Sequence, residues 1–149
     1  MVRARNVSKR RRRGFTLVEV LVVIVVLAVI AAIVLPKFVN SGLRSREAAL
    51  KSNLRIVREA INLFQTDTGL FPASLDDLSA TTAPPKGLTS SGALADIDPA
   101  DWNGPYLESV PNDPISGEEL IYKTAGVGVG RVISSASGTA SDGTAYSSW

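Results

Sequence analysis

The sequence contains no cysteine and no histidine. Without cysteine the chain forms no disulfide, and it has neither a thiolate metal ligand nor a thiol nucleophile. Without histidine it lacks the side chain that most often acts as a general base and most often binds transition metals. These absences exclude the enzyme classes that depend on either residue. They do not identify a compartment, because a secreted domain can fold without disulfides.

Basic side chains are scarce after residue 14. Seven of the sixteen Lys and Arg residues lie in residues 1–14, where there is no acid, and the remainder has nine basic and fourteen acidic side chains. The run Arg10 to Arg13 has the composition of a nucleic-acid-binding or nuclear-import patch. A long apolar run follows it directly, and basic charge beside such a run orients a membrane helix. We therefore expect no nucleic-acid partner.

Residues 15–35 are apolar except for Thr16 and Glu19. As a helix they extend about 31 Å at ~1.5 Å per residue, which matches a hydrocarbon core of roughly 30 Å. The upstream basic charge predicts a single span with a cytoplasmic N-terminus and an extracytoplasmic body. A secretory signal peptide cleaved between Ala28 and Ala32 is the alternative, but the apolar run is long for that class and continues past the alanines.

Residues 36–68 are predicted to continue the same helix with an amphipathic pattern. Pro36 is expected to kink the helix rather than end it. The helix is expected to end before Gly69 and Pro72. One helix of about fifty residues results, which is roughly 75 Å long at ~1.5 Å per residue. A small domain should pack along its apolar stripe. The stripe consists of Leu43, Leu50, Leu54, Val57, Ile61 and Phe64.

Residues 69–149 are predicted to form a small globular part. Residues 73–78 have the pattern of a short capped helix, residues 80–91 the composition of a loop, and residues 102–117 that of a turn-rich connector. Strand signals follow at 119–123, 130–134 and 144–149. The predicted fold class is therefore α+β, with a long N-terminal helix packed on a small C-terminal antiparallel sheet of about three strands.

The segment from Arg13 to Glu19, R-G-F-T-L-V-E, resembles the processing signal shared by type IV pilins and type II secretion pseudopilins. The resemblance implies that a prepilin peptidase cleaves after Gly14 on the cytoplasmic face of the bacterial inner membrane, and that the new terminal Phe15 is N-methylated. It also assigns Glu19 to filament assembly and Pro36 to the helix kink.

Two later segments are similar to major pseudopilins of type II secretion. F-Q-T-D-T-G-L-F-P at 64–72 resembles the segment that ends their long helix, and residues 104–107 with 111–114 and Gly117 resemble their connector to the sheet. The connector departs from theirs after the Asp-Pro pair, where they usually have Trp-Gly and this chain has Ile115-Ser116-Gly117. The resemblance implies a helical homopolymer that acts with minor pseudopilins and an inner-membrane assembly platform in protein export. A type IV pilus subunit for adhesion, motility or DNA uptake is the alternative, although many such pilins close their C-terminal loop with a disulfide.

Major pseudopilins often bind calcium in their C-terminal loop through an acid near the last strand and a second acid in an Asp-Gly pair. Here Asp142-Gly143 fits the second position, but Arg131 stands at the first. A calcium ion normally takes about six to eight oxygen ligands, and a single carboxylate supplies too few of them. No cofactor is required, and Asp142 is the one calcium ligand that the resemblance suggests. Alternatively, Asp142 is a turn residue before Gly143.

Glu19 has a physical reason to act in assembly. Its carboxylate lies about 6 Å into the helix, and at the bilayer centre an acid costs about 2.5 to 3.5 kcal/mol, less near the edge. Cleavage creates an amine on Phe15, which can meet Glu19 of a neighbouring subunit in a staggered stack, so that two desolvation costs are offset. Alternatively, Glu19 extends to the lipid headgroups.

Two other classes of protein fit the sequence less well. An anchored enzyme would need a catalytic pair, but Asp76 and Asp77 are adjacent and point in different directions on a helix. The serines have no histidine to activate them. An anchored binding module would keep its N-terminus at Met1. We therefore predict a structural protein with no catalytic residues.

Overall fold

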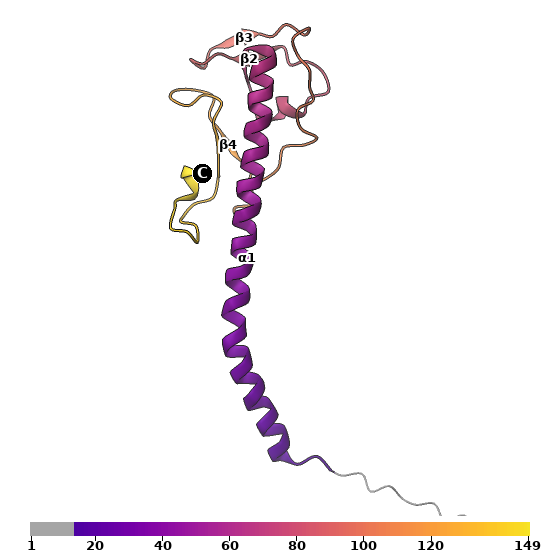
Figure 1. Ribbon diagram of the computed structural model, residues 1–149, viewed down its shortest axis with the longest axis vertical. Coiled ribbons are helices and arrows are strands. Elements are labelled where there is room, and N and C mark those ends of the chain that lie inside the picture. The colour runs from indigo at the N-terminus through magenta and orange to yellow at the C-terminus, as the bar shows by residue number, and fades with distance from the viewer. Residues whose placement is uncertain (1–13) are drawn as a thin grey trace, which may run out of the picture. The chain divides into compact units, whose positions relative to one another are not determined.

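A computed structural model describes residues 14–149, with the backbone alone for residues 35–40. Figure 1 traces the order of the elements along the chain. The chain divides into two compact units, Met1–Asn40 and Ser41–Trp149. Apart from Gly14, the predicted leader lies outside the described residues.

Helix α1, Leu17–Thr68, contains 52 residues, and the prediction of a single helix of about this length is confirmed. Its first 18 residues, Leu17–Val34, are long and apolar enough to cross a membrane. Their side chains are exposed in the isolated chain, as expected of a surface that lipid or neighbouring helices cover. The backbone stays helical through Pro36. The kink there remains a prediction.

The C-terminal end of α1 follows from the conformation of one glycine. Gly69 has a φ of 72° and donates its N–H to the carbonyl of Gln65 at 2.9 Å. This left-handed conformation terminates helices, and glycine adopts it without the steric cost of a Cβ. Thr68 adds a second contact, since its Oγ1 donates to the carbonyl of Phe64 at 2.8 Å. The predicted helix end is confirmed.

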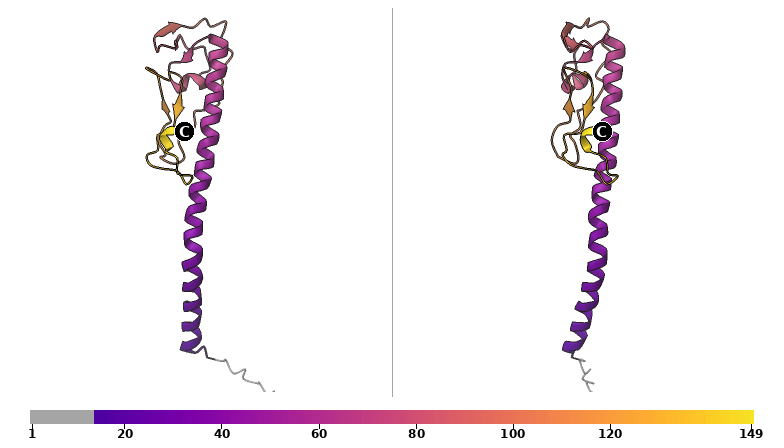
Figure 2. Two further views of the ribbon diagram at one scale, coloured as in Figure 1. Left: turned by 60° about the vertical axis from the view of Figure 1, so that its left-hand side comes forward. Right: turned by 90° about the vertical axis from the view of Figure 1, so that its left-hand side faces the viewer.

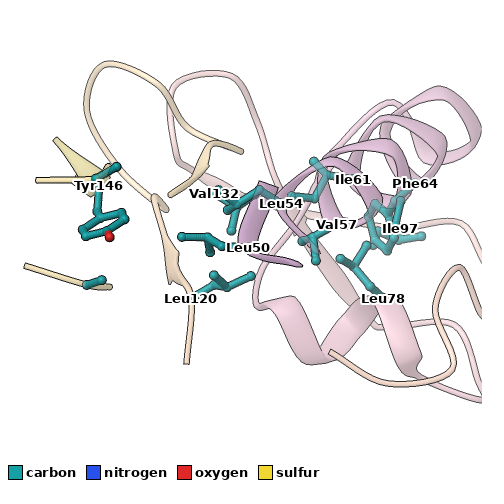
Figure 3. Packing of buried hydrophobic residues seen from close by; sticks show 13 residues of the cluster. Leu50, Leu54, Val57, Ile61, Phe64, Leu78, Ile97, Leu120, Val132 and Tyr146 are labelled. Carbon is teal, nitrogen blue, oxygen red and sulfur yellow. The ribbon is translucent and has the colours of Figure 1, made fainter. Parts of the chain in front are cut away.

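The apolar stripe of α1 forms one side of the core of Ser41–Trp149. Five of its six predicted members are at most 2% exposed, whereas Leu43 is 39% exposed. In both views of Figure 2, the rest of this unit lies along one side of the helix. The buried members point toward a shared cluster, which Figure 3 shows. Their partners from the remainder of the unit include Leu78, Ile97, Leu120 and Val132.

A three-stranded antiparallel sheet follows α1 directly. It consists of β1 (Phe71–Pro72), β2 (Lys86–Leu88) and β3 (Leu94–Asp96) in the order β1-β2-β3. The strands are close at Gly87, where a Cβ would come within 2.8 Å of the carbonyl oxygen of Phe71. The prediction of a loop over residues 80–91 is therefore wrong for β2. Between β1 and β2, the predicted short helix is present as the 3-10 helix η1, Leu75–Ser79.

A two-stranded antiparallel sheet contains two of the three predicted strands. β4 (Ile121–Tyr122) pairs with β5 (Val132–Ile133), with Ile121 opposite Ile133. The third prediction, a strand at 144–149, is wrong, because this segment forms the 3-10 helix η2, Tyr146–Ser148. The α+β class is confirmed, but the sheet of three strands comes from a different part of the chain. Side chains of α1 hold the last segment instead, as described below.

Candidate functional site

The first turn of α1 contains a capping box formed by Thr16 and Glu19. The N–H and the Oγ1 of Thr16 each donate to Oε2 of Glu19 at 2.9 Å, and the N–H of Glu19 donates to Oγ1 of Thr16 at 3.3 Å. Such a pair satisfies backbone N–H groups that have no partner within the helix, which explains why α1 begins at Leu17. The Thr-x-x-Glu spacing from Thr16 to Glu19 is the sequence signature of a capping box, and it is the signal by which the role of Thr16 could have been predicted.

The predicted cleavage position lies just before this capping box. Gly14 and Phe15 precede the helix, and Phe15 is 78% exposed. A Cβ placed on Gly14 would meet no atom within 4 Å, as far as the described residues go. Exposed, non-helical backbone of this kind is what a protease requires. The Glu19 carboxylate is held near the helix N-terminus, where the helix dipole favours negative charge.

A second cluster joins α1 to the C-terminal loop, defined here as residues 137–149. Glu47 of α1 is only 6% exposed. Its Oε1 accepts hydrogen bonds from the N–H of Ser141 at 2.8 Å and from the hydroxyl of Tyr146 at 2.9 Å, and its Oε2 accepts from Oγ of Ser141. The Ser141 hydroxyl is the main cause that lowers the pKa of Glu47, against the effect of burial. Glu47 thus binds the loop as a hydrogen-bonded carboxylate.

One turn further along α1, Lys51 contacts the same loop. Its Nζ lies 3.1 Å from Oδ2 of Asp142 and 4.0 Å from the ring centroid of Trp149. Oδ1 of Asp142 accepts from the N–H and Oγ1 of Thr144, at 3.0 and 2.6 Å. The pKa of Asp142 is lowered to about 2. The hydrogen bond from the Thr144 hydroxyl has the largest effect, followed by that from the Thr144 N–H and by Lys51. Asp142 is thus an ionised turn residue before Gly143, held from both sides.

The oxygen atoms of Asp142 are not available as ligands for a calcium ion. Both carboxylate oxygens of Asp142 accept hydrogen bonds within the chain, and one of them is paired with an ammonium group. Within residues 14–149, no three acidic side chains are grouped as a cation would need. Arg131, at the other suggested position, precedes β5 and lines a hollow together with Arg58 and Phe71. The two positions that the resemblance suggested for a calcium ion therefore hold an ion-paired aspartate and an arginine.

Asp113 is a buried acid whose importance the sequence did not reveal. It is 0% exposed. Its Oδ1 accepts from the N–H of Ile115 at 2.8 Å, and its Oδ2 accepts from Oγ of Ser134 and from the N–H of Ala136 at 3.3 Å. Burial acts to raise its pKa, but these hydrogen bonds together lower it. Asp113 therefore joins the connector to the segment after β5, whereas its Pro-Asn-Asp-Pro context indicated only a turn.

We expect acid to loosen the globular part. Glu47, Asp113 and Asp142 all have lowered pKa values in the folded chain. A depressed carboxyl stabilises the fold above its unfolded pKa, and this contribution is lost as the pH falls through the folded value. For Asp142 the window runs from 3.8 down to about 2. Thermal unfolding followed by near-ultraviolet circular dichroism should give a midpoint that falls by several degrees between about pH 5 and pH 2.5.

The Asp142→Asn variant is the control for this experiment, since it removes one of the three titrating groups. Its midpoint should be lower than that of the wild type at neutral pH and should change less with acid. Equal midpoints for the wild-type chain at the two pH values would contradict the expectation.

Two protein-family models match the chain, one at its N-terminal segment and one over most of the remainder. Residues 9–35 match the prokaryotic N-terminal methylation motif, and residues 37–146 match the family of type II secretion system (T2SS) protein G. The first match covers the predicted processing signal, and the second covers the amphipathic part of α1 with the globular part. No solved structure matches the chain.

Individual relatives agree with this result. The type II secretion system core protein G of Xanthomonas campestris pv. campestris is 32% identical over 125 residues, which are 83% of this chain and 77% of the relative. The core protein G of Pseudomonas aeruginosa is 28% identical over 72% of this chain and 70% of the relative. That of Aeromonas hydrophila is 30% identical over 66% and 73%. The chain therefore belongs to the type II secretion system protein G family, the major pseudopilins that its leader signal and connector resemble.

Proposed function

We propose that this chain is the major structural subunit of a type II secretion pseudopilus, which polymerises from the inner membrane to support protein export. The observation that carries the proposal is a single carboxylate, Glu19, held at the start of an apolar span of 18 residues, Leu17–Val34. The match to protein G favours this function over that of a surface pilus. The chain acts as a building block and performs no catalysis.

Processing is the first step of this function. A prepilin peptidase removes the basic leader after Gly14 at the cytoplasmic face, and Phe15 becomes the N-methylated terminus. Methylation keeps the amine positively charged. The exposure of Phe15 supports this step, and a Cβ placed on Gly14 would meet no atom of residues 15–149 within 4 Å. Within this part of the chain, neither residue must be released from a packed contact before cleavage.

Assembly is the second step. The subunit rests in the inner membrane with its N-terminus in the cytoplasm and its globular part outside. In a staggered stack, the Phe15 amine of one subunit meets the Glu19 carboxylate of the next, which offsets the desolvation of both charges and selects the register. The exposed apolar side chains of Leu17–Val34 then become the core of the filament. Minor pseudopilins and an assembly platform in the inner membrane are the expected partners.

The mass of the membrane-extracted protein, combined with N-terminal sequencing, tests this proposal. We expect a mature chain that begins with N-methylated Phe15. The matched variant Gly14→Leu should accumulate as the uncleaved precursor. A side chain at position 14 meets no described atom, so this substitution should not disturb the fold. Failure to cleave the variant would therefore show that the peptidase no longer recognises the site. A wild-type chain that keeps Met1, or that begins near Ile33, would contradict the proposal.

A further inference from the structure

Two charged residues on one face of α1 hold the C-terminal loop through different contacts. Glu47 and Lys51 are four residues apart, so they lie on the same face of the helix. Glu47 accepts from Ser141 and Tyr146, whereas Lys51 pairs with Asp142. The loop is therefore bound by an acceptor and a cation that both belong to the chain itself.

The ammonium group of Lys51 occupies the place where a metal ion would neutralise Asp142. It lies 3.1 Å from Oδ2 of Asp142 and 4.0 Å from the centroid of the Trp149 ring. A cation over the face of a tryptophan is attracted by the negative ring face. Thr144 links the two partners of Lys51, since its Oγ1 donates to Asp142 and accepts from Nε1 of Trp149 at 2.6 Å. One lysine thus connects the turn to the last residue.

A divalent cation would have to displace this arrangement. Next to Asp142 it would be repelled by the positive charge of Lys51 and would compete with Thr144 for Oδ1. The remaining acid on this face, Glu47, already accepts three hydrogen bonds from the loop. Calcium normally collects about six to eight oxygens. The carboxylate oxygens of these two residues are fewer than that, and they already accept the hydrogen bonds that order the loop.

We infer that this chain closes its C-terminal loop with the Lys51 ammonium in place of a calcium ion, so that the order of the loop does not depend on divalent cations. The Lys51–Asp142 pair is half exposed, at 56% and 45%, and an exposed ion pair by itself contributes little. Its effect comes from the contacts joined to it. Trp149 packs edge-on against Tyr146, with 5.3 Å between the ring centroids, and Tyr146 is buried against Glu47.

The experiment compares the full-length, membrane-extracted protein in about 5 mM calcium with the same protein in chelator. This concentration exceeds the dissociation constants of about 10⁻⁴ to 10⁻³ M that are typical of extracellular calcium modules. A calcium site would raise the unfolding midpoint by several degrees and slow amide exchange in residues 138–149. We expect a difference in midpoint below about 1 °C and the same exchange rates in both buffers.

The Lys51→Met variant tests the role of the lysine directly. Its loop amides should exchange at least about threefold faster than those of the wild type, with and without calcium, because local opening becomes easier. Lys86→Met is the matched control: Lys86 is equally exposed at 56% and pairs with Asp96 at 3.9 Å, and its loss should leave the loop unchanged. Asp142→Asn should reproduce the effect of Lys51→Met.

Two results would overturn the inference. One is a saturable stabilisation of the wild-type loop by calcium. The other is normal loop exchange in both the Lys51→Met and the Asp142→Asn variants.

Discussion

The Glu19→Leu variant is expected to insert into the membrane and to be cleaved normally, but to form at least about tenfold less filament than the wild type. A tenfold reduction corresponds to a loss of about 1.4 kcal/mol in the free energy of assembly. This is a modest loss, because every subunit added to the filament would lack one charge pair. The physical reason is that the terminal amine of a neighbouring Phe15 enters the apolar filament core without a partner, which is costly for a charged group. Filament yield in sheared fractions, with the mass of the mature chain, measures both parts.

The Glu19→Gln variant separates the charge from the capping box. Glutamine also serves at this position of a capping box, so it keeps the hydrogen bonds with Thr16 that begin the helix. It carries no charge and should therefore assemble as poorly as Glu19→Leu. Filaments of normal yield from Glu19→Gln would mean that helix capping, rather than charge pairing, is the contribution of this residue. Normal filaments from both variants would refute its role in assembly.

The Asp113→Ala variant is expected to lose about 3 to 4 kcal/mol of the free energy of unfolding. Asp113 is fully buried, and alanine would leave the hydroxyl of Ser134 and the N–H groups of Ile115 and Ser135 without their acceptor. Buried donors without partners cost about 1 to 3 kcal/mol each when water cannot replace the acceptor. Because domains are stable by only about 5 to 15 kcal/mol, the loss should also lower the amount of mature protein.

Two controls define this experiment, in which unfolding by denaturant is followed by circular dichroism. Asp113→Asn keeps one oxygen acceptor and the volume of the side chain, so it should lose less than Asp113→Ala. Asp96→Ala changes an acid whose side chain is 88% exposed and should stay within about 0.5 kcal/mol of the wild type. If Asp113→Ala were no more destabilised than Asp96→Ala, the buried hydrogen bonds would not carry the stability assigned to them.

The strands illustrate where prediction from the sequence failed. Each strand contains two or three residues, which is too short for an alternating pattern to appear. β2 includes Gly87 in a segment rich in Thr, Pro, Gly and Ser, so its composition indicated a loop. Its pairing with β1 and β3 is a matter of hydrogen bonds between segments, and residue type within the segment does not reveal it.

The strand predicted for residues 144–149 was wrong for a related reason. Residues 144–149 contain Thr, Tyr and Trp, which are typical of strands. Instead, the two aromatic side chains are held by α1: the hydroxyl of Tyr146 donates to Glu47, and Trp149 lies against Lys51. A side chain that finds such a partner outweighs the weak local preference of its backbone.

The sequence by itself determined the processing signal, the apolar span and the long amphipathic helix with its end at Gly69. Each of these depends on residues within a few positions of one another, through helical periodicity, turn chemistry and charge next to an apolar run. Only the tertiary structure decided what Asp113 and Asp142 do. Lys51 meets Asp142 across 91 positions, and Glu47 meets Tyr146 across 99. Contacts over such separations arise when the chain packs on α1, so a local pattern that reads as a turn contains no trace of them.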